Sequence, residues 1–287
     1  MPKHRALCIG AGRIGAGYNW MQTPYCYTHA EAYLALKDRV ELLGFVEPDG
    51  DRAFTAQKKY GVPVWEHLED ALDAAKPDVV SICTQPEERA QIIDRLTEEC
   101  PSVVGIWAEK PIGIKGPYYR LKPHHIVVNY WRRFEPMHRR IKDRLDAGEL
   151  GEVVALTVAA KKDVHTVCHF TNLALWWGVP PAKFHYVGID GTEYQSAEYT
   201  LYTTTRVLRF EAGGAMMTED AAQESHIFPG LKLPMKKDSR AWSPIFMEEA
   251  LSDLLNVMDG VSLNVKSPPE SACEAERWAD EILKGNA

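Results

Sequence analysis

Three glycines near the start of the chain have the spacing of a dinucleotide-binding loop. Gly10, Gly12 and Gly15 follow a short apolar run, and Arg13 and Ile14 stand between the second and third glycine. The first glycine permits a tight turn, the second lets the backbone approach a pyrophosphate, and the third allows close packing of helix on strand. We therefore expect these five residues to contact a nicotinamide dinucleotide. A glycine turn without a ligand is the alternative.

An acidic residue follows the second apolar run, at residues 40–46. Glu47 could accept hydrogen bonds from the 2′-hydroxyl of an adenosine ribose, and it would repel a 2′-phosphate. This chemistry favours NAD over NADP as the cofactor, although NADP is possible.

The distance from the glycines to this acid departs from the usual pattern. Glu47 lies 32 residues after Gly15, whereas about 20 is usual. Residues 16–27 account for the excess, and we interpret them as an insertion. Its aromatic residues Tyr18 and Trp20 are expected to reach the substrate from a flap at the ligand-binding edge of the sheet. The alternative is a surface loop that contacts no ligand.

The elements that must position these residues alternate between strand and helix over residues 1–130. Each predicted strand is apolar throughout, which is typical of a parallel sheet covered on both faces. Strands are expected at 6–10, 40–46, 62–65, 78–83 and 103–108, and helices at 28–37, 51–60, 68–75 and 87–99. The sequence therefore predicts a doubly wound α/β Rossmann domain.

The pattern changes after residue 130. A helix is expected at 136–147 and two more at 244–259 and 267–284, with β-type runs at 153–160, 183–189, 199–210 and 215–219. The Thr, Tyr and Val residues of these runs suit a half-exposed antiparallel sheet. We expect residues 131–287 to form an α+β domain with a large open, mainly antiparallel sheet, which binds substrate and supports oligomerisation.

Composition limits the possible partners and the compartment. A length of 287 residues suits two domains. The net charge of −7 argues against nucleic acid, and no apolar run approaches the roughly 20 residues of a membrane span. The six cysteines are scattered without zinc spacing. We expect a cytoplasmic protein that binds neither nucleic acid nor a membrane.

Several motifs together resemble one enzyme family. Glu109-Lys110-Pro111 is similar to the Glu-Lys-Pro signature of the Gfo/Idh/MocA oxidoreductases, which include glucose-fructose oxidoreductase and inositol dehydrogenase. The run from Asn129 to Pro136, which contains Arg133, resembles the family's Arg-Phe-x-Pro junction. With further similar stretches at 148–153 and 246–283, the resemblance covers nearly the whole chain. It implies an NAD(P) cofactor, a carbohydrate-like substrate and a homo-oligomer.

The resemblance also implies roles for single residues. Lys110 would hydrogen-bond the substrate hydroxyl and stabilise the alkoxide that forms as hydride leaves, and His169 would act as general acid or base. Glu109, Thr84 and Pro86 would contribute to the cofactor site.

The substrate side of the family site is altered in this chain. The resemblance places Arg133 there, and it places His165 where the family has an aspartate in an Asp-x-x-x-His motif. Asp163, two residues earlier, is the other candidate for that role. His165 and His169 could also hold a metal ion, but no third ligand has suitable spacing, so no metal is expected.

These residues predict hydride transfer between a nicotinamide and a sugar, nucleotide-sugar or cyclitol-like carbinol or ketone. One alternative is a non-catalytic regulator that senses a dinucleotide or sugar with the same fold, and the missing aspartate favours it. Another is a reductase of a non-sugar substrate. Lys110 and His169 favour catalysis.

Overall fold

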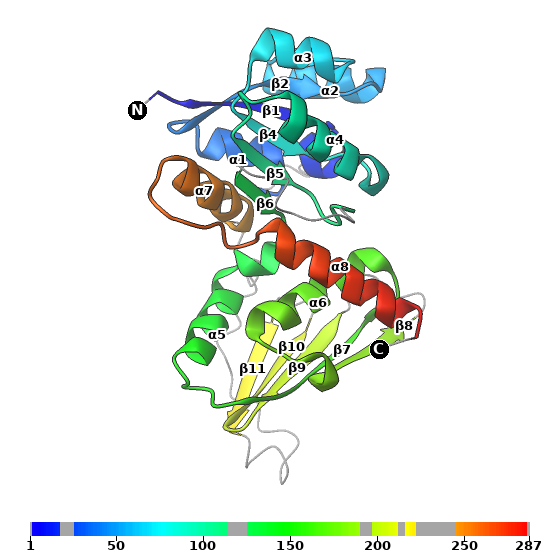
Figure 1. The fold of residues 1–287 in the computed structure, drawn as a ribbon, viewed down its shortest axis with the longest axis vertical. Helices are drawn as coiled ribbons and strands as arrows, with labels where there is room; N and C mark the ends of the chain where they lie inside the picture. Colours follow the sequence, from blue (N-terminus) through cyan, green and yellow to red (C-terminus); the bar gives the residue numbers. More distant parts are fainter. Residues whose placement is uncertain are drawn as a thin grey trace. The chain divides into compact units, whose positions relative to one another are not determined.

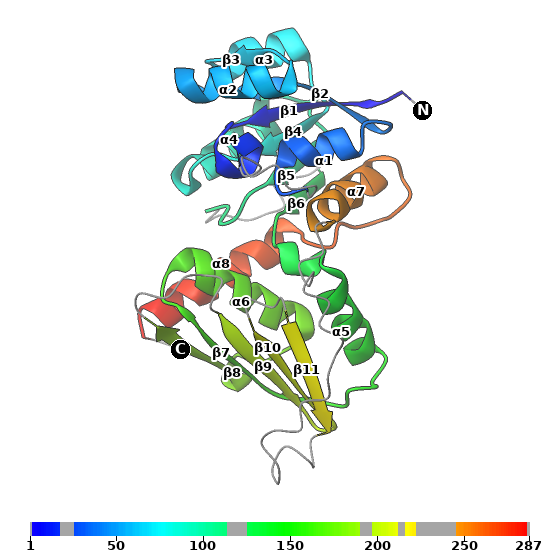
Figure 2. The same cartoon turned by 180° about the vertical axis from the view of Figure 1, so that it is seen from behind.

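The chain folds into two compact units. The computed structural model describes residues 2–17, 26–113, 125–189, 197–211, 216–221 and 245–285. The first unit is Met1–Phe134 with Pro244–Cys273, and the second is Glu135–Ser243 with Glu274–Ala287. Both are drawn in Figures 1 and 2.

A six-stranded parallel sheet forms the centre of the first unit. Its order is β3-β2-β1-β4-β5-β6, and every neighbouring pair is parallel. The strands are β1 (His4–Ile9), β2 (Val40–Val46), β3 (Val64–Trp65), β4 (Val79–Ile82), β5 (Gly105–Ala108) and β6 (His125–Val128). Strands β4 and β5 are buried at every residue, as their apolar sequences predict. The expected doubly wound sheet is confirmed.

Helices cover both faces of this sheet. They are α1 (His29–Ala35), α2 (Gly50–Tyr60), α3 (Leu68–Ala75), α4 (Pro86–Glu99) and α7 (Phe246–Met258). Figures 1 and 2 show α1 beside α7 on one face and α4 on the other. None of the helices in the described ranges is long and apolar enough to cross a lipid bilayer.

The position of α7 differs from the expected division of the chain at residue 130. This helix comes from the end of the sequence, yet it packs on β5, β6 and α1 of the first unit. Its Leu251 and Leu254 are fully buried there. Gly105 in β5 admits the helix, because a Cβ at that position would lie 2.4 Å from the sulfur of Met258.

Two strands were not predicted from the sequence. Strand β6 is four residues long, like its neighbour β5, but it begins with a half-buried histidine and contains only three apolar residues. The run at 199–210 is two strands, β9 (Glu198–Thr203) and β10 (Arg206–Glu211), joined by a tight turn. Thr203 Oγ1 accepts the N–H of Arg206 at 3.0 Å, so a threonine completes a turn that has no glycine to mark it.

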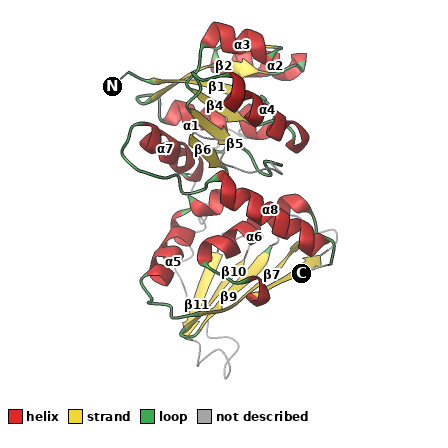
Figure 3. Cartoon of the chain, viewed as in Figure 1, coloured by secondary structure: helices red, strands yellow, loops and turns green. Residues whose placement is uncertain are grey.

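The second unit contains a mixed sheet, drawn in yellow in Figure 3. This sheet has five strands. Its order is β11-β10-β9-β7-β8, where only the pair β7–β8 is parallel. The further elements are α5 (Pro136–Asp146), β7 (Val153–Lys161), α6 (Val164–Trp177), β8 (Phe184–Ile189), β11 (Met216–Ala221) and α8 (Pro269–Leu283). The expected mainly antiparallel sheet is confirmed.

Aromatic rings fill the space between this sheet and its helices. Phe210 and Tyr199 stack with centroids 4.4 Å apart, and Trp177 of α6 lies 5.7 Å from Phe210. His138 stacks on the same group, and its ring nitrogens contact Glu135 Oε2 and the Tyr199 hydroxyl, each at 2.5 Å. Burial raises the pKa of Glu135, but its hydrogen bonds with His138 outweigh that effect and hold it below the usual value.

Phe210→Ala should destabilise the protein by about 3–5 kcal/mol, because it leaves a cavity in a fully packed aromatic cluster. Chemical denaturation followed by circular dichroism measures the change. Phe54→Ala is the matched control, since Phe54 is 67% exposed and should change stability by less than about 0.5 kcal/mol. Equal losses in the two variants would contradict this description of the core.

Candidate functional site

The glycine loop follows β1 at the carboxyl edge of the first sheet. Gly10 has a φ of 91°, and its N–H donates to the Val46 carbonyl at 2.8 Å. A Cβ on Gly15 would lie 2.0 Å from the Gly10 carbonyl oxygen, whereas a Cβ on Gly12 would meet no atom within 4 Å. Gly10 and Gly15 are therefore required by the loop itself. The space beside Gly12 is open to a ligand.

One helical turn follows the loop where a longer helix would be usual. Residues Arg13–Gly17 form a π-type turn with Arg13 exposed and Ile14 half-buried. Lys59 Nζ and the Tyr60 hydroxyl, both from α2, donate to the Ala16 carbonyl at 3.2 and 3.0 Å. The turn is thus held by α2. Tyr18 and Trp20 lie outside the described residues.

Glu47 is buried and tied to the glycine loop. Its Oε2 accepts the N–H of Ala11 at 2.9 Å, and its Oε1 accepts the N–H of Asp49 at 3.0 Å and Nη2 of Arg52 at 2.9 Å. The acid lies beside the loop; its contact with an adenosine ribose stays a prediction. The half-exposed Arg52 places a positive charge next to the Glu47 carboxylate. This contact was not predicted from the sequence.

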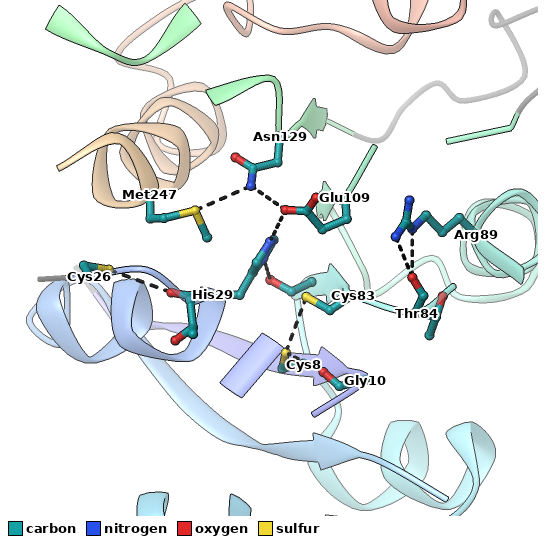
Figure 4. A network of polar contacts seen from close by, with 12 residues as sticks. Cys8, Gly10, Cys26, His29, Cys83, Thr84, Arg89, Glu109, Asn129 and Met247 are labelled. Atoms are coloured by element: carbon teal, nitrogen blue, oxygen red, sulfur yellow. Dashed lines mark hydrogen bonds and ion pairs between the residues drawn. The ribbon is translucent and has the colours of Figure 1, made fainter. Parts of the chain in front are cut away.

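The loops after β4 and β5 are joined by a buried arginine. Arg89 Nε and Nη2 donate to the Thr84 carbonyl at 3.0 and 2.6 Å (Figure 4). Its Nη1 donates to the Pro111 carbonyl at 2.9 Å. Thr84 and Pro86 are half-buried, and Pro86 begins α4. These three hydrogen bonds of Arg89 fix the backbone of both loops at the sheet edge where the cofactor is expected.

Glu109 and Lys110 follow β5 directly, and they have different surroundings. The Glu109 carboxylate is buried, and its Oε1 accepts from His29 Nε2 at 3.2 Å and from Asn129 Nδ2 at 2.5 Å (Figure 4). Burial raises the pKa of Glu109, but His29, Lys110 and Asn129 together lower it to about 2. The carboxylate is therefore charged at neutral pH. Lys110 is half-buried.

His29, Arg52 and Asn129 are site residues that sequence reasoning missed. His29 follows the helix cap Thr28, and Asn129 begins the run that resembles the family junction, so both positions carried a local signal. What could not be read was that β5 and β6 are neighbours and that His29 of α1 packs on Trp107 of β5. The pairing depends on contacts far apart in sequence.

Arg133 lies in the first unit, and its surroundings are mostly protein. It is 5% exposed, and its Nη1 donates to the Lys266 carbonyl at 2.9 Å. Burial lowers the pKa of Arg133 to about 10. The guanidinium thus helps to hold the segment between α7 and α8. Its contact with a substrate remains a prediction.

The histidine motif lies at the start of α6 in the second unit. His169 is 5% exposed and His165 is exposed. Asp163 caps the helix, since its carboxylate accepts the N–H of Thr166 at 2.8 Å, and it also pairs with Lys161 at 2.9 Å. Within the described ranges, no three His, Cys, Asp or Glu side chains are grouped to hold a metal ion.

A family model matches part of the first unit. Residues 5–116 match the model of a family described as "Oxidoreductase family, NAD-binding Rossmann fold" (GFO_IDH_MocA). The chain is 24% identical over 192 residues to scyllo-inositol 2-dehydrogenase (NAD(+)) of Bacillus subtilis, covering 63% of this chain and 48% of that protein. It is 29% identical over 161 residues to inositol 2-dehydrogenase of Rhizobium meliloti, covering 53% and 44%. The aligned segments span about half the length of these relatives or less.

A solved structure shares the fold of both units. The WlbA dehydrogenase from Bordetella pertussis, in complex with NADH and UDP-GlcNAcA, has a TM-score of 0.72 and 13% identity, and the match covers 99% of this chain and 97% of that one. At this identity the likeness shows the fold alone.

Two glycine substitutions should separate ligand binding from folding. Gly12→Ala should leave the melting temperature unchanged but weaken NADH binding at least about tenfold, because its methyl group enters the open space beside the loop. Gly15→Ala should lower the melting temperature, because its methyl group meets backbone. Fluorescence titration with NADH and thermal melts measure both effects. Full NADH affinity in Gly12→Ala would place the ligand elsewhere.

Proposed function

We propose that the chain belongs to the Gfo/Idh/MocA oxidoreductase family, whose model matches its residues 5–116, and that it is an NAD-dependent dehydrogenase or reductase. Its substrate would be a sugar, nucleotide sugar or cyclitol-like carbinol or ketone. The observation that carries the proposal is Lys110, which follows β5 at the edge where the glycine loop leaves the same sheet.

The residues at this edge fit a dinucleotide. Gly12 leaves open space beside the loop, and Glu47 stands next to the Ala11 backbone, where an adenosine ribose would lie. Gly10, Arg13, Ile14 and Gly15 complete the loop. Thr84, Pro86 and Glu109 would support the nicotinamide end. When bound, the cofactor supplies the hydride donor or acceptor.

In the proposed reaction Lys110 and His169 take part in proton transfer. The Lys110 side chain would hydrogen-bond the substrate oxygen and stabilise negative charge as it develops there. His169 would give or take a proton as general acid or base. Lys110 lies in the first unit and His169 in the second, so their joint action is part of the proposal.

The substrate class rests on the relatives, two of which are named as inositol dehydrogenases. We propose that His165 faces the substrate in place of the family aspartate, since the Asp163 carboxylate already caps α6. Arg133, Tyr18 and Trp20 are proposed as further substrate contacts.

The self-association of this chain and its location in the cell are also proposals. The second sheet carries exposed apolar residues in β7 and β8, Val154 at 48% and Val187 at 62% exposure. Exposed apolar side chains on one sheet suit a homo-oligomer interface. A cytoplasmic location accords with the free cysteines of the described chain.

A regulator with the same fold is the rival hypothesis, and the exposed His165 in place of the aspartate favours it. Such a protein would bind NADH but turn over no polyol or sugar.

The preference for NADH over NADPH should depend on Glu47. NADH should bind more tightly than NADPH. Glu47→Gln should reduce the ratio of the NADPH to the NADH dissociation constant at least about tenfold, because the amide keeps the Ala11 contact but does not repel a 2′-phosphate. Fluorescence titration with both cofactors measures the two dissociation constants. Asp73→Asn is the control, since it removes an exposed carboxylate of the same unit. A wild-type preference for NADPH would overturn the assignment.

Lys110→Ala should lower kcat by at least about 100-fold and leave the NADH dissociation constant within about twofold, because the amine acts mainly in the transition state. The assay follows NADH absorbance with scyllo-inositol, myo-inositol and UDP-sugar acids. Lys37→Ala, an exposed lysine after α1, is the control. Wild-type turnover in Lys110→Ala would show that Lys110 is not catalytic.

A further inference from the structure

Arg52 is held at the sheet edge where the cofactor is proposed to bind. Asp49 caps α2, and its Oδ1 accepts the backbone N–H of Arg52 at 2.9 Å. The Arg52 side chain reaches the residue after β2, where its Nη2 donates to Glu47 Oε1 at 2.9 Å. This hydrogen bond raises the pKa of Arg52, so the guanidinium is charged. A positive charge therefore lies beside the acid that is expected to contact the adenosine ribose.

The Glu47 carboxylate already accepts most of the hydrogen bonds that it can accept. A carboxylate has about four positions for donors. The Asp49 N–H and Arg52 Nη2 occupy two of them on Oε1, and the Ala11 N–H occupies one on Oε2. The Glu47 side chain is only 4% exposed. About one position therefore remains for a ribose hydroxyl, so recognition of the 2′-position by Glu47 alone is limited to a single hydrogen bond.

Arg52 can bind a second acceptor without giving up Glu47. A guanidinium carries five N–H groups in a planar fork, and this fork matches the oxygens of a phosphate. The contact with Glu47 is made through Nη2. The Arg52 side chain is 54% exposed, so a ligand can approach it from the solvent side. A phosphate beside Glu47 could therefore accept hydrogen bonds from Arg52.

The ion pair between Glu47 and Arg52 changes the electrostatics of this edge. A carboxylate alone would repel the 2′-phosphate of NADP(H) and favour NAD(H). Here a guanidinium 2.9 Å away balances that carboxylate, and the cation is the more exposed partner of the pair, 54% against 4%. Other exposed charges nearby are of both signs, Arg13 on the glycine turn and Asp49 and Asp51 at the start of α2, and water screens them. An anion at the ribose therefore meets an ion pair and not an isolated acid.

We propose that Arg52 recognises the 2′-phosphate of NADP(H), so that one site binds both cofactors. This inference rests on the proposed function and adds a second cofactor to it. Arg52 Nη2 keeps its hydrogen bond to Glu47, and the other N–H groups of the guanidinium donate to the phosphate oxygens. Glu47 disfavours the 2′-phosphate and Arg52 favours it, so the two residues shift the cofactor preference in opposite directions. NADH remains the tighter ligand, and Arg52 limits the difference.

Two fragments of the cofactors test the proposal without a catalytic step. ADP-ribose and its 2′-phosphate derivative lack the nicotinamide and differ only in the 2′-phosphate, and isothermal titration calorimetry gives the dissociation constant of each. Arg52→Ala should weaken binding of the 2′-phosphate derivative at least about tenfold, because charge-assisted hydrogen bonds to the phosphate are lost. Binding of ADP-ribose should change by less than about twofold, because Glu47 keeps its bonds to Ala11 and Asp49.

Two further variants separate charge from geometry. Arg52→Lys keeps the charge but loses the planar fork, so its affinity for the 2′-phosphate derivative should lie between those of the wild type and Arg52→Ala. Lys58→Ala removes an exposed cation in the last turn of the same helix and should leave both affinities unchanged. In the wild type, sodium chloride should weaken the 2′-phosphate derivative more steeply than ADP-ribose, and Arg52→Ala should reduce that difference.

Equal weakening of both fragments in Arg52→Ala would overturn the proposal, because Arg52 would then act only by holding Glu47. Unchanged binding of the 2′-phosphate derivative in Arg52→Ala would overturn it too. Thermal melts show whether each variant is folded. Failure of the proposed function would appear differently, as a wild type that turns over no substrate with either cofactor while Arg52→Ala still separates the two fragments. A folded wild type that binds neither fragment would refute the dinucleotide site, and this proposal with it.

Discussion

The hydrogen bond from His29 to Glu109 is the interaction on which the site region of the first unit depends. A buried carboxylate is costly unless donors satisfy it. Here one donor comes from α1 and the other from the residue after β6, while the carboxylate follows β5, so three elements must keep their places for the charge to be tolerated. The sulfur of Met247 in α7 contacts the same Asn129 amide at 3.5 Å, which brings a fourth element to this point.

The loops around this centre are fixed by backbone contacts. Glu47 accepts the Ala11 N–H, and Arg89 binds the carbonyls of Thr84 and Pro111. Neither interaction needs a ligand to form. These contacts within the protein restrict the backbone of the loops at the edge where the cofactor is proposed to bind.

Local sequence patterns predicted most of the elements, and contacts between distant residues decided the rest. Strand β2 and helix α3 begin and end where apolar periodicity placed them, because each buries its own apolar residues on the sheet. The glycine loop and Glu47 follow β1 and β2, as the local pattern indicated, and their contacts with a cofactor stay a prediction. The pairing of His29 with Glu109 joins residues 80 positions apart, and no local pattern encodes it. The place of α7 was missed because its contacts with β5, β6 and α1 join residues far apart in the sequence.

The return of α7 to the first sheet has a consequence for biosynthesis. The ribosome makes the six strands of the first unit long before it makes Phe246–Met258, with nearly the whole second unit in between. Until then the apolar surface over Gly105 has no helix on it. Folding therefore cannot proceed strictly from the N-terminus, as it does for many two-domain chains. In the partly synthesised chain this sheet face is exposed and could aggregate. A chaperone that binds apolar surface would bind there.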